Sequence, residues 1–263
     1  MRVNNWGLAL LLGVSTLAGA AEEDEIVTDR PDFVESSNVV GKGRFQIETS
    51  IAQERDKADG FKDRTWSTPT LLRFGVSDTL ELRFETDGRM RAISDNLATG
   101  ARNTENGYAD VALGVKWHMA DEDGMRPSMG ILVHADLDTG SSAFRAPGKG
   151  GSVRLAAEWE LPDEFSLGVM PGLASQRNDD GERYTSAIFG IVLGKGWTDR
   201  FRTFVEYSAP QIARSRNGGS VTTFDIGAAY MVANTVQVDT AVSRGLNRNT
   251  PDWSWTVGLS IKF

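Results

Sequence analysis

The chain has 263 residues, of which 40% are hydrophobic and 24% are charged, and its formal net charge is −8. The acidic balance argues against nucleic-acid binding, because such proteins need a basic face. The absence of cysteine excludes disulfides, thiolate metal sites and cysteine nucleophiles. Since His118 and His134 are the only histidines, a multi-histidine metal centre is disfavoured, and we expect neither metal nor cofactor.

Residues 1–20 have the pattern of a secretory signal peptide. A positively charged start precedes an apolar stretch from Trp6 to Leu17, and the small residues Ala18-Gly19-Ala20 follow. A membrane anchor is disfavoured because this run is shorter than the ~20 residues that a spanning helix needs. We therefore expect export of the chain and cleavage after Ala20.

Residues 21–42 show no strand pattern and contain the block Asp29-Arg30-Pro31-Asp32-Phe33. Pro31 biases Arg30 toward extended backbone. Phe33 and Val34 are apolar, and a free tail would leave both side chains exposed to water. We predict a periplasmic N-terminal segment docked in the mouth of the following domain, with Arg30 paired to a carboxylate. A loose periplasmic tail is the alternative.

From residue 43 to residue 263 the chain alternates between apolar and polar side chains. The runs from Arg44 to Ile51 and from Trp253 to Phe263 alternate over their whole length. A period of two indicates strands with one apolar face, and since no segment keeps a helical period, helices are not expected. About twelve segments qualify: 44–53, 65–76, 80–87, 107–119, 127–138, 152–161, 165–175, 184–195, 201–209, 220–232, 236–246 and 252–263.

The connections between these segments alternate in length. Short links at 77–79, 121–126, 162–164, 196–200 and 233–235 alternate with longer polar links at 54–64, 88–106, 140–151, 176–183, 210–219 and 247–251. Short turns on one side and long loops on the other are typical of outer-membrane barrels. Aromatic residues of the apolar face lie near strand ends, whereas a soluble β-sandwich, the alternative, would place them mid-strand. We predict an all-β fold: a transmembrane antiparallel up-and-down β-barrel of about 12 strands over 43–263, in the outer membrane of a Gram-negative bacterium.

The polar face of the strands should line the interior of this barrel. Both signs of charge occur on it, which predicts a narrow lumen crossed by Arg–carboxylate pairs, because lone buried charges are costly. These residues form either a path for a small solute or a set of ion pairs that only stiffens the barrel. The predicted lumen residues are Glu48, Arg73, Glu81, Arg83, Glu85, Asp110, Lys116, His134, Asp136, Arg154, Glu158, Arg202, Phe204, Glu206, Asp225 and Asp239.

Four stretches carry a resemblance to a known family: Thr28–Ser36 around the Asp-Arg-Pro-Asp-Phe block, Gly43–Glu48, Leu72–Arg83 and Val236–Asp239. The chain resembles the outer-membrane transporter family linked to the meta-cleavage pathway of phenol degradation. The resemblance covers essentially all of the chain after the signal peptide, and it implies a barrel and uptake of small organic compounds. In addition, Phe263 closes an alternating strand and resembles the signal that barrel-assembly machinery recognises.

Motifs that suggest an enzyme are incomplete. Asp138-Thr139-Gly140 resembles an aspartic-protease loop, but the chain has no second copy. An outer-membrane lipid hydrolase needs Ser and His at the rim, and neither histidine has an outward Ser at matching height. We predict a non-enzymatic transporter or channel for small organic solutes, aromatic compounds included. The alternatives are a structural or surface-interaction barrel with a closed lumen and, as a minor one, a lipid hydrolase. The expected partners are outer-membrane lipid, the assembly machinery and a small organic solute.

Overall fold

The computed structural model describes residues 25–263, and the predicted signal peptide lies outside them. Within this range no helix has the length and apolarity to cross a membrane. The strands are β1 (Phe45–Ala58), β2 (Phe61–Ser67), β3 (Thr70–Gly75), β4 (Leu80–Thr86), β5 (Arg89–Asn96), β6 (Arg102–Tyr108), β7 (Val111–Ala120), β8 (Ser128–Leu137), β9 (Gly150–Leu161), β10 (Phe165–Val169), β11 (Gly172–Arg177), β12 (Arg183–Thr198), β13 (Phe201–Ile212), β14 (Val221–Ala233), β15 (Val236–Gly245) and β16 (Trp253–Lys262), with one 3-10 turn at Ser215–Asn217.

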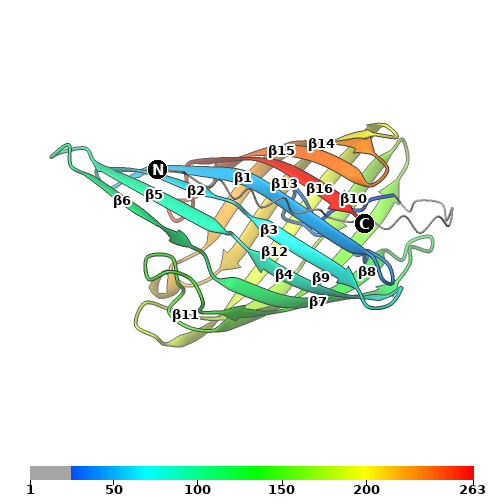
Figure 1. Cartoon of the computed structure of the whole chain (residues 1–263), viewed down its shortest axis with the longest axis horizontal. Helices are drawn as coiled ribbons and strands as arrows, with labels where there is room; N and C mark the ends of the chain where they lie inside the picture. Colours follow the sequence, from blue (N-terminus) through cyan, green and yellow to red (C-terminus); the bar gives the residue numbers. More distant parts are fainter. Residues whose placement is uncertain (1–24) are drawn as a thin grey trace, which may run out of the picture.

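The strands form a closed antiparallel barrel (Figure 1). Closure is made by β1 and β16, which pair from Gln46↔Lys262 to Arg55↔Trp253. The wall has twelve strands, because four of them are interrupted and consist of two segments each: β2 with β3, β4 with β5, β6 with β7, and β10 with β11. The predicted all-β barrel of about 12 strands is confirmed.

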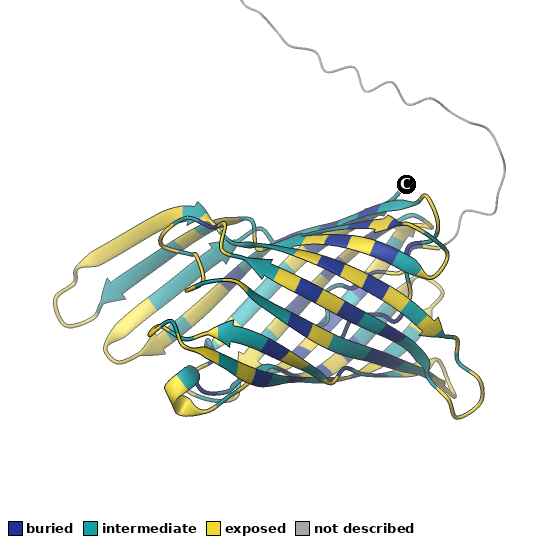
Figure 2. Ribbon diagram, turned by 90° about the horizontal axis from the view of Figure 1, so that it is seen from below, coloured by how far each residue is buried: buried dark blue, intermediate teal, exposed yellow. Residues whose placement is uncertain are grey.

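Burial alternates along the strands, as the banding in Figure 2 shows. The lipid-facing positions are apolar and exposed, for example Val257 and Leu259 of β16. The inward positions are polar and buried, and Glu48, Arg73 and Lys116 are completely inaccessible to solvent. This inverts the arrangement of a water-soluble protein and is what a strand with one face in lipid requires.

Two predicted loops are wrong, because the structure has strands there. Residues 54–64 and 88–106 belong largely to the ends of β1 and β2 and to the hairpin of β5 and β6. In these stretches the alternation is between opposite charges, as in Glu54-Arg55-Asp56-Lys57, so the search for an apolar period missed it. The four segments extend the sheet beyond the barrel rim, at the left of Figure 1.

Residues 25–44 precede the wall and are packed against its inward face. The backbone N–H of Ile26 donates to the Asn234 carbonyl at 2.8 Å. Further along, small residues of the wall allow close approach: a Cβ added at Gly75 would lie 1.6 Å from the Gly41 carbonyl oxygen, and one at Gly130 would lie 2.7 Å from the Ser37 carbonyl oxygen. Larger side chains at these two positions would push the segment away from the wall. We call residues 25–44 the inner segment.

Candidate functional site

The inner segment and the inward side chains of the wall form one buried ionic cluster, with Asp29 at its centre. The carboxylate of Asp29 accepts from Arg83 Nη1 at 2.6 Å and from Lys116 Nζ at 2.7 Å. Arg73 Nη1 lies 3.4 Å away, and the Asp29 side chain is only 1% exposed. A carboxylate from the inner segment thus neutralises cations of three wall strands, β3, β4 and β7.

The environment of Asp29 fixes its charge state. Burial by itself raises the pKa of this carboxyl, but the charges of Arg73, Lys116 and Arg83 outweigh burial and hold the pKa well below its usual range. Asp29 is therefore ionised at every physiological pH, and it holds the inner segment by charge as well as by hydrogen bonds.

Arg73 links the inner segment to two further carboxylates. Its guanidinium donates to Glu81 at 2.9 Å and to Glu48 at 3.0 Å, both of which are inaccessible to solvent. The same group donates to the backbone carbonyls of Val27 and Asn38, at 2.9 and 2.8 Å. Because a guanidinium has five donors in a fixed plane, Arg73 can join two stretches of the inner segment to the wall at once.

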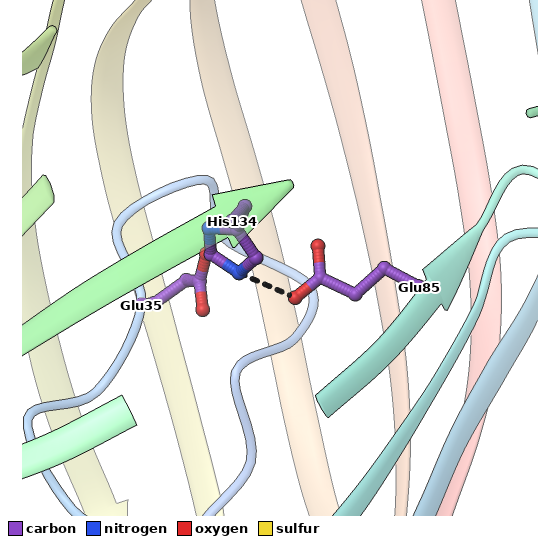
Figure 3. Close-up of side chains that lie close together, drawn as sticks. All are labelled: Glu35, Glu85 and His134. Carbon is purple, nitrogen blue, oxygen red and sulfur yellow. Dashed lines mark hydrogen bonds and ion pairs between the residues drawn. The ribbon is translucent and has the colours of Figure 1, made fainter. Parts of the chain in front are cut away.

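Glu35, Glu85 and His134 form a second cluster, drawn in Figure 3. Their potential ligand atoms lie within 4.8 Å of one another, and His134 Nε2 is 3.0 Å from a Glu85 oxygen. Each carboxylate is already engaged, because Arg83 bonds Glu35 at 2.6 Å and Glu85 at 2.9 Å, and Arg154 bonds Glu35 at 2.8 Å. Two guanidiniums beside two carboxylates oppose a cation, so this arrangement is that of an ion-pair network rather than a metal site.

The wall also holds the inner segment through backbone donors. Glu206 of β13 accepts from the N–H groups of Phe33 and Val34, at 2.8 and 2.7 Å. Val34 itself packs in a small apolar cluster with Met170, Val192, Phe204 and Ala241. Phe204, an apolar residue predicted in the lumen, is therefore buried in the same cluster as Val34 of the inner segment and is not open to a solute.

Other predicted lumen residues complete these contacts. Arg30 Nη2 lies 3.3 Å from Asp239, and Arg202 donates to the Arg30 carbonyl at 3.0 Å. Glu158 accepts from the Ser37 N–H at 2.6 Å. By contrast, within the described residues Asp110, Asp136 and Asp225 make no hydrogen bond or ion pair with the inner segment: Asp110 accepts from two loop N–H groups, and Asp225 accepts from Thr223.

Two hollows lie on opposite sides of the inner segment. One, of about 310 Å³, is lined by Glu25, Val27 and the short turn 198–200 between β12 and β13. The other, of about 400 Å³, is lined by Arg30, Phe33 and wall residues that include Asp87, Asp110 and Asp136, next to the long loops. The inner segment thus separates a hollow at the short-turn end from one at the long-loop end.

Sequence reasoning missed several of these groups. Glu35, Ser36 and Ser37 bond Arg83, Arg154, Glu158 and Lys116, yet they lie just beyond the Asp-Arg-Pro-Asp-Phe block and were not among the predicted residues. Glu35-Ser36-Ser37 is a run of three polar residues in a stretch of mixed polarity, and this run was the one sign in the sequence that these residues bind polar groups of the wall. The backbone donors of Phe33 and Val34 have no sequence signal at all.

The closed wall, with apolar residues outward and charged residues inward, defines the class of outer-membrane β-barrels. Solved structures share this fold. The COG4313 outer membrane channel from Pseudomonas putida F1 is 12% identical, with a TM-score of 0.61 over 89% of this chain and 99% of that one. The NanC porin is 10% identical, with a TM-score of 0.51 over 83% and 100%. The beta domain of the Bordetella autotransporter BrkA is 12% identical, with a TM-score of 0.51 over 84% and 99%.

Residues 28–263 match the family described as "Putative MetA-pathway of phenol degradation", and the chain belongs to that family. The resemblance in sequence is thereby confirmed. No curated protein matches the chain.

Proposed function

We propose that this protein is a passive outer-membrane channel for small organic solutes, aromatic compounds included, and that the inner segment controls passage through it. The observation that carries the proposal is the pair of hollows separated by the inner segment, one at each end of the barrel. Movement of residues 25–36 would join the two hollows into one path. The protein would be exported, would lie in the outer membrane of a Gram-negative bacterium, and would expose its long loops outside.

The charges around the hollow at the long-loop end favour particular solutes. Asp87, Asp110 and Asp136 line it, and within the described part of the chain none of the three makes an ion pair. Unpaired carboxylates repel anions and attract cations. We therefore expect the channel to admit neutral or cationic solutes, a neutral phenol for example, more readily than carboxylate anions.

One observation favours the alternative, a barrel whose lumen stays closed. The inner segment is held at Asp29, Phe33, Val34 and Ser37 by charged wall residues. If these contacts never release, the barrel has a structural role or acts through its loops. The two functions differ in one measurable property, which is whether the inner segment leaves the lumen.

A disulfide that can be formed and reduced tests this in one protein sample. A Cβ built at Gly168 lies 4.0 Å from Val34 Cβ, within the ~3.5–4.5 Å of disulfides. The wild-type chain has no cysteine, so Val34→Cys with Gly168→Cys gives a single bridge between the inner segment and β10. The reduced form is the matched control, because it carries the same packing change next to Val192.

The assay is the permeability of liposomes to a neutral phenol and to benzoate, measured as the excess over protein-free liposomes, because a neutral phenol also crosses the bilayer itself. The proposal expects permeability in the reduced form, its loss on oxidation and its return with reductant, with the phenol faster than benzoate. Equal permeability in both redox forms would refute control by the inner segment. Absence of permeability in the wild type and in the reduced form would refute the channel and favour the closed barrel.

A further inference from the structure

Charges are sorted by face on the part of the sheet that extends beyond the barrel. Along β1 the order Glu54-Arg55-Asp56-Lys57 alternates acid and base, and Lys62-Asp63-Arg64 of β2 does the same. Since successive side chains of a strand point to opposite faces, this order places bases on one face and acids on the other. The sequence thus encodes a charged sheet with two unlike faces.

The pairing register shows that the basic face is continuous across four strands. Arg55 is opposite Arg64, which is opposite Ile93, and two residues away Trp66 is opposite Arg91. The bases of this face are Arg55, Lys57, Lys62, Arg64, Arg89, Arg91 and Arg102, and its one acid is Asp95. The opposite face of the same strands carries Glu54, Asp56, Asp63 and Glu105 and no base. We call the first set the basic face.

The basic face points outward, away from the lumen. Gln53 is paired with both Trp66 and Trp255, and the two indole rings meet edge to face at 5.5 Å. Trp255 shares its side of β16 with Val257 and Leu259, which are exposed apolar residues of the lipid-facing wall. The basic face therefore continues the lipid-facing surface, beginning next to the Trp66–Trp255 pair and extending toward the long loops.

Most of these bases lack an acidic partner. Asp95 pairs with Arg64 at 3.1 Å and with Arg102 at 2.6 Å. Arg55 donates to Gln53 at 2.6 Å. For Arg55, Lys57, Lys62, Arg89 and Arg91, all exposed, the described part of the chain offers no ion pair. Five cations without an ion pair on one face are unexpected in a chain of net charge −8, because random placement would surround them with acids.

We propose that the basic face binds the phosphate groups of a phosphorylated glycolipid of the outer leaflet, with lipid A as the probe of that class. Tryptophans of a barrel lie at the membrane interface, where lipid headgroups are. Arg91 is directly opposite Trp66, and Arg64 lies two residues further along β2, so the cations begin at the level of this tryptophan. Arginine and lysine are the residues that bind phosphate, the former in a bidentate way. The inference rests on the orientation in the proposed function, with the long loops outside.

The test uses the detergent-solubilised full chain and native mass spectrometry. Lipid A with two phosphates and lipid A stripped of both are titrated separately against the wild type. The variant Lys57→Gln/Lys62→Gln/Arg89→Gln/Arg91→Gln removes four of the five cations without an ion pair and leaves Arg55, which donates to Gln53. The matched control Lys149→Gln/Arg214→Gln/Arg216→Gln/Arg248→Gln removes the same charge from exposed loop positions off this face. A folded barrel is verified by its heat-modifiable migration, and Lys57→Gln/Lys62→Gln alone replaces the fourfold variant if that one misfolds.

The wild type should bind the phosphorylated lipid far more tightly than the stripped one. Each cation removed should weaken binding about fivefold, and the loop control should bind like the wild type. Equal binding of both lipids by the wild type, or equal losses in the variant and the loop control, would overturn the proposal. Competition by millimolar inorganic phosphate as strong as that by the lipid would overturn the assignment to a lipid.

This experiment is independent of the channel. Liposomes without lipid A measure permeability, and there the fourfold variant should conduct like the wild type. Lipid A binding by a protein that never conducts would leave this inference standing and refute the proposed channel. Permeability without phosphate-dependent binding would support the proposed channel and refute the lipid-binding inference.

Discussion

Asp29→Asn is the sharpest perturbation of the inner segment, because it keeps the size of the side chain and removes only its charge. Lys116 Nζ is left with uncharged acceptors, which are the new amide oxygen and the backbone carbonyls of Ser36 and Asn38 at 2.7 and 3.4 Å, and it loses its ion pair with a carboxylate. Arg83 keeps its ion pairs with Glu35, Glu81 and Glu85. The loss is therefore concentrated on one buried ammonium group.

Removing one partner of a buried ion pair costs about 3–5 kcal/mol. Since Lys116 keeps two carbonyl acceptors, we take the lower end, about 3 kcal/mol, as the loss in docking free energy of the inner segment. At 1.4 kcal/mol per factor of ten, the undocked fraction should rise roughly a hundredfold. The barrel wall is held by its own backbone pairing, and its heat-modifiable migration should be unchanged.

The assay measures undocking without relying on conduction. In a Val34→Cys background, the introduced thiol is buried against β10 and β13 until the segment moves, so its labelling rate follows the undocked fraction. Asp32→Asn is the matched control in the same segment, because its partner Arg202 is 3.4 Å away and 36% exposed. An exposed pair of this kind is worth at most about 1 kcal/mol, or about a fivefold change in labelling.

Equal labelling rates for the Asp29→Asn and Asp32→Asn variants, with intact barrels, would refute the reasoning that charge burial at Asp29 holds the segment. A hundredfold rise of the labelling rate in both variants would also refute this reasoning, since the exposed Asp32–Arg202 pair would then hold the segment as strongly as the buried Asp29 pairs.

Three further expectations follow from particular contacts. Because the pKa of Asp29 is depressed, its contribution to docking is complete above the unfolded value of about 4 and is lost only as the pH falls through the lower folded value. The ratio of labelling rates between the Asp29→Asn variant and the chain with Asp29 should therefore be the same at pH 7 and pH 5. A ratio that falls toward one by pH 5 would contradict this. Phe263→Ala removes a ring 6.2 Å from Phe45 at the β1–β16 seam and should lower the yield of heat-modifiable barrel more than Phe165→Ala does, whereas equal yields would remove the special role of the seam. A thiol from Asn217→Cys should label on intact cells and one from Asn234→Cys only after the outer membrane is broken; the opposite pattern would reverse the orientation.

The sequence by itself determined the barrel. The alternation of apolar and polar residues in strands such as Trp253–Lys262 is a local property, because the two faces of a strand meet lipid and lumen whatever its neighbours are. The same reasoning placed charged residues such as Glu48 and Arg73 inside. It failed at 54–64 and 88–106, where the faces differ in the sign of charge and not in polarity, so the extension of the sheet and its basic face were missed.

Only the tertiary structure decided what the inward charges do. Asp29 meets Arg83 and Lys116 across 54 and 87 residues of chain, and no local pattern relates positions so far apart. The path of the inner segment also depends on backbone N–H groups, which every residue except proline has and which leave no trace in a sequence. Whether a polar inward face surrounds water or a packed segment is a question of volume, and volume is fixed only when the wall has closed around residues 25–44.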